Sequence, residues 1–185
     1  MQMLYSMSRD NGLEYRDMQA RYWDQINKSF QLYLFNLLYF IHIAEYARRD
    51  AERRNTKLLP SEEDLQFVPK LCDNPLLASL LNNEQLHALF KYYQLKEKID
   101  GDTVRLIYTD FSKDNDEYLE YVLQKDNSTE EHQQVLLALY KHCIQHEHFN
   151  EVIEDHFPQW VDDKSLVVGA MKKTIKALPS PTDFY

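Results

Sequence analysis

The eighteen residues from Phe30 to Ala47, FQLYLFNLLYFIHIAEYA, form the most apolar run of the chain and constrain its fold most strongly. The polar residues of the run are Gln31, Asn36, His42 and Glu45. At about 100° per residue, three of these, Gln31, His42 and Glu45, lie on one narrow stripe of a helix. The same stripe takes in the flanking charged residues Asp24, Lys28, Arg49, Glu52 and Arg53. This pattern predicts one long helix over about residues 22–54.

A helix that is apolar on almost all sides is buried either among other helices or in lipid. A membrane span needs about 20 consecutive, mostly apolar residues, whereas this run contains four polar ones and has densely charged flanks. Phe35 and Leu38 also interrupt the polar stripe. We therefore expect the central helix of a multi-helix bundle and no membrane partner. The residues expected to be buried deeply, on the side away from the charged stripe, are Phe30, Leu34, Leu37 and Ile41.

The composition also favours helices. The 185 residues include only three glycines, and sheet turns and phosphate-binding loops depend on glycine. No signal peptide opens the chain, so a cytoplasmic protein is the default expectation. Two cysteines, Cys72 and Cys143, provide neither a disulfide framework nor a four-ligand metal set, and we expect both thiols to be unpaired.

Further helices are predicted from their capping residues. Asn74 can cap a helix that begins at Pro75, and Ser128 with Glu131 has the spacing of a capping box. We expect a turn at 100–102, a helix that starts at Asp102 or Thr103, and a last helix that is capped by Asp162. The buried face of this last helix is predicted to include Leu166, Val167, Ala170, Met171, Ile175 and Leu178.

The predicted fold class is therefore all-α. One helical domain is expected over residues 1–178, followed by a linker or tail over residues 179–185, where two prolines stand among Ser and Thr. Residues 1–9 have the pattern of the end of a helix, with Gly12 as its stop.

Basic residues gather at the end of the long helix, at Arg48, Arg49, Arg53, Arg54 and Lys57. Cations at a helix C-terminus complement the dipole, so a purely structural role is one interpretation. Five basic residues within ten also match a phosphate-contacting patch. The net charge of −9 argues against a nucleic-acid footprint over the whole surface but leaves room for such a local patch.

Two histidines, His142 and His146, share one helix face at the spacing that metal sites use. The surrounding sequence HCIQH is not a metalloprotease motif, and no third ligand is fixed by spacing. We therefore interpret them as surface histidines and expect no metal or cofactor. The chain also lacks phosphate-binding, dinucleotide-binding and nucleophile-elbow motifs, so we do not expect an enzyme.

Three stretches resemble the NusB transcription antitermination factors, in the enlarged form of the Bacteroidetes type. MQMLYS at residues 1–6 resembles the first-helix motif of that family. The segment from Leu32 to Leu65 resembles its second helix and the following connection, and the segment from Phe157 to Leu178 resembles the stretch before its carboxy-terminal half. The arginine-rich segment that precedes MQMLYS in the family, and its carboxy-terminal half, are absent here. The resemblance thus implies the amino-terminal portion of such a protein.

The resemblance implies an all-helical protein that binds boxA-type RNA beside a small ribosomal-subunit protein and favours antitermination. Gln2 and Tyr5 are the positions that match the RNA-facing first helix of the family. The other candidates for RNA contact come from the residues themselves and are Arg48, Arg49, Arg53 and Arg54. The alternative hypothesis is a helical protein-interaction module without RNA binding of its own.

Overall fold

The computed structural model describes residues 15–59, 61–62 and 67–180. This part of the chain contains no β-strand and eight α-helices: the long helix α2 (Tyr15–Asn55) and seven shorter ones that form a bundle with it. The shorter helices that follow are α4 (Pro75–Leu81), α5 (Glu84–Tyr92), α6 (Gly101–Asp114), α7 (Asp116–Leu123), α8 (Thr129–Gln145), α9 (Glu147–His156) and α10 (Trp160–Lys176). A 3-10 turn (Leu95–Lys98) connects α5 to α6. The prediction of an all-α bundle around one long helix is confirmed.

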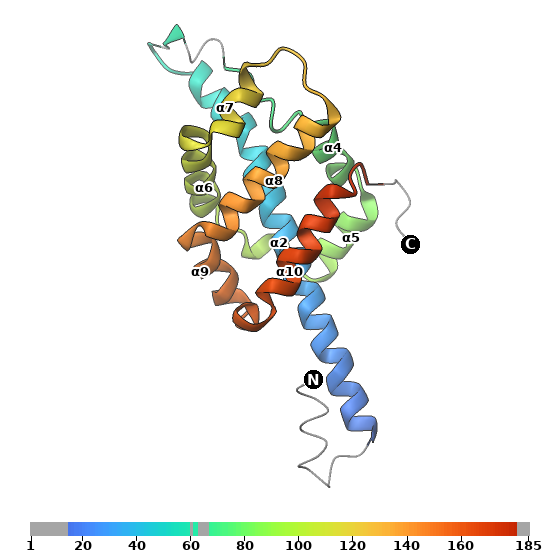
Figure 1. Cartoon of the computed structure of the whole chain (residues 1–185). Coiled ribbons are helices and arrows are strands. Elements are labelled where there is room, and N and C mark those ends of the chain that lie inside the picture. Colours follow the sequence, from blue (N-terminus) through green and yellow to red (C-terminus); the bar gives the residue numbers. More distant parts are fainter. Residues whose placement is uncertain (1–14, 60, 63–66, 181–185) are drawn as a thin grey trace.

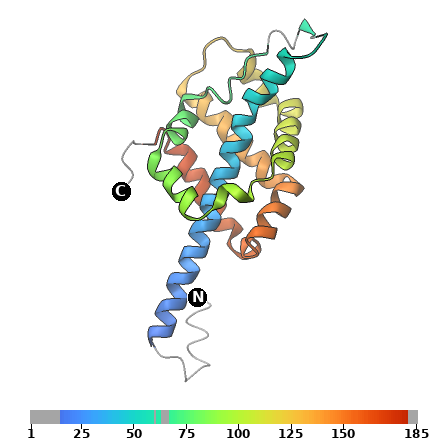
Figure 2. The same cartoon turned by 180° about the vertical axis from the view of Figure 1, so that it is seen from behind.

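Helix α2 runs through the middle of the bundle, with α6 and α9 on one side of it and α5 and α10 on the other (Figure 1). Its apolar run supplies much of the core, and residues such as Leu34, Leu37 and Ile41 are almost completely buried as predicted. Phe30 was predicted to be buried too, but 39% of its surface is exposed. The reason is that α2 leaves the bundle at this point. Its first turns extend beyond the other helices (Figure 2), and α2 begins seven residues earlier than the predicted Tyr22.

The buried polar groups of α2 are hydrogen-bonded. The Asn36 side chain donates to the Leu32 carbonyl at 3.1 Å and accepts from the Tyr140 hydroxyl at 3.4 Å. The Tyr39 hydroxyl donates to the Asp100 carbonyl at 3.2 Å. Because an unsatisfied buried polar group is costly, these bonds fix the rotation of α2 against α8 and against the start of α6.

Capping residues set the starts of the shorter helices. Asn74 caps α4, and Ser128 with Glu131 forms the predicted capping box of α8. Two predicted starts are wrong by a few residues. Asp100 caps α6 by accepting from the Thr103 backbone N–H at 2.9 Å, so α6 begins at Gly101. Helix α10 begins at Trp160, which places Asp162 in its first turn instead of at its cap.

The last helix buries one face on α2 and α8. Val167, Met171 and Ile175 are buried as predicted, but 63% of Leu166 is exposed because it lies off that face. Beyond α10, the Ser180 backbone N–H donates to the Ser79 hydroxyl at 2.9 Å, which holds the chain end of the described part against α4. None of the described helices is long and apolar enough to cross a membrane.

Candidate nucleic-acid interface and neighbouring surfaces

The four candidate arginines lie in the last two turns of α2, but they differ in what they contact. Arg53 and Arg54 both bind Asp50, whose side chain is only 3% exposed. The Arg53 guanidinium lies 2.6 Å from one carboxylate oxygen, and Nε of Arg54 lies 2.8 Å from the other. The Arg54 guanidinium also lies over the Phe67 ring, 4.2 Å from its centroid. These two arginines therefore neutralise a buried carboxylate.

Arg48 and Arg49 are exposed on the side of α2 one turn earlier. Arg48 reaches toward α4 and lies 3.6 Å from the Asp73 carboxylate. Arg49 makes no ion pair with any described residue, and its charge acts on His42 one to two turns back. Burial lowers the pKa of His42, the Glu45 carboxylate opposes this shift, and the positive charges of Lys96 and Arg49 add to it. Of the four arginines, Arg49 is thus the one whose charge is least compensated.

The predicted site residues therefore form no single free patch. Three of the four arginines are held by acidic side chains, which weakens the field that they could present to a phosphate. The other two candidates, Gln2 and Tyr5, lie outside the described residues.

An apolar groove lies on the opposite half of the molecule from the arginines, between α2, α5 and α10. This apolar groove has a volume of about 510 Å³. Its walls come from Tyr33 and Leu37 of α2, Leu86 and Leu89 of α5, and Leu178 after α10. Its walls come from three separate segments, the first and last of which are more than a hundred residues apart, so no local pattern in the sequence predicts it.

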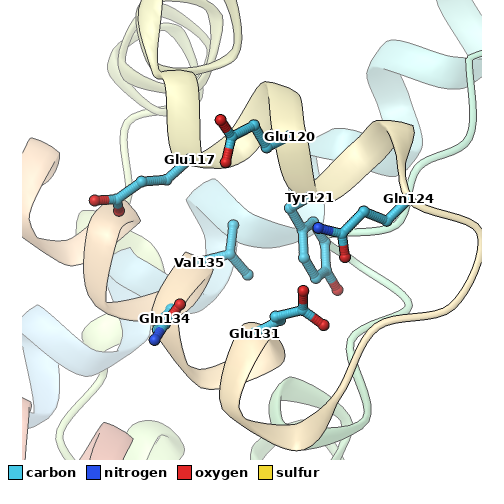
Figure 3. A pocket seen from close by; sticks show the side chains of 7 residues that line it. All are labelled: Glu117, Glu120, Tyr121, Gln124, Glu131, Gln134 and Val135. Carbon is cyan, nitrogen blue, oxygen red and sulfur yellow. The ribbon is translucent and has the colours of Figure 1, made fainter.

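A small acidic pocket of about 100 Å³ lies between α7 and α8 (Figure 3). Glu117 and Glu120 of α7 and Glu131 of α8 are among the residues that line it. Glu131 already accepts a 2.7 Å hydrogen bond from the Ser128 backbone N–H, and this bond lowers its pKa. No group of residues in the described part of the chain has an arrangement that would hold a metal ion.

His142 of α8 and His146, which directly follows α8, are not the surface residues that we expected. His142 packs against Phe111, with ring centroids 5.5 Å apart, and His146 lies 3.2 Å from the Asp110 carboxylate. One nitrogen of each ring is buried and has no hydrogen-bond partner among the described residues. They line the contact between α8 and α6.

Comparisons of the chain with protein-family models, with curated proteins and with solved structures find no match.

Proposed function

We propose that the chain is the amino-terminal portion of a NusB-type transcription antitermination factor, which binds boxA-like RNA beside a small ribosomal-subunit protein. The observation that carries the proposal is the contact between α2 and α10. These helices hold the two long stretches that resemble the family, and the Tyr33 and Thr174 hydroxyls join them at 2.8 Å. Stretches that resemble one family and lie far apart in sequence thus belong to one packed unit.

In this proposal, RNA affinity depends mostly on sequence beyond the described residues. Phosphate contacts supply most of the affinity of such complexes and their salt dependence. Of the four candidate arginines, Arg49 is the one best placed for such a contact, because the other three pair with acids, and the net charge of −9 opposes it. We expect the 185 residues alone to bind with a dissociation constant of about 10⁻⁴ M or weaker at physiological salt, with little preference between sequences.

Fluorescence anisotropy with a boxA-like RNA and its scrambled counterpart tests the proposal. A protein extended by the upstream basic segment and the carboxy-terminal half is expected to bind boxA tightly and selectively, unlike the 185-residue chain. If the extended protein shows no preference for boxA, the antitermination proposal is wrong.

Submicromolar, selective binding by the 185 residues alone would instead place the RNA site on the arginines. Arg48→Glu combined with Arg49→Glu should then abolish binding. Arg53 is left unchanged because it pairs with the buried Asp50 carboxylate. The matched control is Arg105→Glu, which reverses an exposed arginine of α6.

The second candidate is a protein-interaction module that does not bind RNA itself. The pairing of Arg48, Arg53 and Arg54 with acids and the apolar groove between α2, α5 and α10 both favour it. If neither the chain nor the extended protein binds RNA, this function is the one to pursue.

A further inference from the structure

The first part of α2, residues 15–30, forms an arm that projects from the bundle (Figures 1 and 2). Within the described chain, its hydrogen bonds to other helices are confined to its base. Tyr93 donates to the Asn27 side chain at 2.8 Å, and Ser29 donates to Asp163 at 2.6 Å. Most of the stability of a helix in a protein comes from the packing of its apolar face, so such an arm gains stability when another surface covers it.

The arm has one apolar face. Tyr22, Trp23, Ile26 and Phe30 follow one another at helical spacing, and each is between 39% and 59% exposed. The opposite side carries Asp17, Arg21, Asp24 and Lys28, and the last two form an ion pair at 2.8 Å. A contiguous exposed apolar face of this kind marks an interaction surface.

The apolar face of the arm continues into the groove. Tyr33, Leu34 and Leu37 follow Phe30 on the same side of α2 at intervals of three, four and seven residues, and all three line the groove. Phe30 itself belongs to both the arm and the groove wall. The projecting apolar face of the arm and the apolar groove therefore lie next to each other on one side of α2.

We propose that this combined surface binds a second copy of the chain through an antiparallel contact between the two arms. A two-fold axis near Ile26 would bring Tyr22 against the partner's Phe30, and Gln19 against the partner's Tyr33. Each arm would then lie over the mouth of the other copy's groove. An interface with two-fold symmetry must be self-complementary. The surface meets this requirement because it carries both a projecting apolar face, on the arm, and the apolar groove that would receive the same face of the second copy.

The surface available is large enough for such a contact. Three half-exposed aromatic residues, each with about 150–250 Å² of surface, offer about 300 Å² per copy. Phe30 is counted here and also lines the groove, so the partner's groove adds less, about 200 Å². This gives about 500 Å² per copy and about 1,000 Å² in total, the smallest area expected of a specific interface. The charged side of each arm remains in solvent. Lys173 also lines the groove, and a lysine can cover apolar surface with its methylene chain while its ammonium stays in water at the rim. The proposal does not depend on RNA binding.

Sedimentation equilibrium of the 185-residue chain is the first test. Because interfaces of about this size are often weak or transient, the measurement is made at a high concentration of about 100 µM, where we expect about twice the 22.2 kDa chain mass. Trp23→Glu with Ile26→Glu should give a monomer of unchanged helicity. The matched control, Leu119→Glu with Leu123→Glu, changes two exposed apolar residues of α7 and should remain a dimer.

Disulfide capture tests the axis. Ile26→Cys should form an intermolecular disulfide under mild oxidation, whereas Leu123→Cys should not, and both native thiols are buried.

Ala177→Trp, which fills the groove, should weaken the dimer without lowering the midpoint of urea unfolding. A chain that stays monomeric at every concentration overturns the proposal, whether the face is then covered from within the polypeptide or by another protein. A dimer that survives the arm substitutions also overturns it.

Discussion

Arg54 donates from Nε to Asp50 at 2.8 Å, one turn earlier in α2, and the Asp50 carboxylate is buried at the end of the central helix. Arg53 binds the second oxygen of the same carboxylate. A basic cluster that looks like a nucleic-acid patch in the sequence therefore contains two guanidiniums that compensate one buried charge. The structural and the RNA-binding interpretations can be separated by testing each arginine.

Asp50→Asn is expected to lower the free energy of unfolding by about 1.5–3 kcal/mol, the range for hydrogen bonds to charged groups. The amide keeps the shape but removes the charge that both arginines bind. Urea unfolding measures the effect. Asp73→Asn is the matched control, because the Arg48–Asp73 pair is exposed and should contribute less than about 1 kcal/mol. Equal losses in the two variants would contradict this assignment.

Leu37→Ala or Ile41→Ala is expected to cost about 2–5 kcal/mol, because both side chains are buried in the core. Phe30→Ala should cost less than either, since Phe30 lies at the base of the arm and is partly exposed. The midpoint and slope of urea unfolding measure all three. An unchanged midpoint in the Leu37 and Ile41 variants would show that the core lies elsewhere.

The comparison of Phe30 with Leu37 shows what the sequence could predict. Both lie on the apolar face of one helix, and periodicity identifies that face correctly. Periodicity does not show where the helix leaves the bundle, because this depends on how far α5 and α10 extend along it. The exposure of Phe30 was therefore missed, and the apolar groove, whose walls come from three separate segments, was missed for the same reason.

Local signals were predicted more successfully. Asn74 and Ser128 were identified as caps because the groups that they bind lie two or three residues away. The start of α6 was missed by one or two residues because Asp100 and Asp102 both have capping side chains within one turn. At the arginines, the sequence predicted the helix end but not the burial of Asp50, which decides what Arg53 and Arg54 do.

Neither thiol should react rapidly in the folded protein. Cys72 and Cys143 are both buried and unpaired, and burial raises the pKa of each thiol, which lowers the fraction of reactive thiolate. A thiol-reactive dye should therefore label two groups per chain in denaturant and react slowly with the native protein. Fewer than two groups in denaturant without reductant would contradict the unpaired state, and rapid native labelling would contradict their burial.

Stability should fall as the solution is acidified below neutral pH. Burial lowers the pKa of His42, His132 and His142 in the folded protein from the ordinary value of 6.5. Below pH 6.5 the unfolded chain therefore binds more protons than the folded one. The contribution of these histidines to the free energy of unfolding is fully present above this pH and is lost as the pH falls toward the pKa values of the folded protein.

His142 offers the sharpest test of this pH dependence. Its ring packs against Phe111 and faces His146, whose positive charge when protonated lowers the pKa of His142 further, while the Asp110 and Asp114 carboxylates oppose this shift. His142→Phe should therefore make the free energy of unfolding less dependent on pH between about 7 and 5. His148→Gln, at an exposed position in α9, is the matched control. If His142→Phe changes the slope no more than His148→Gln does, His142 is not a source of the acid sensitivity.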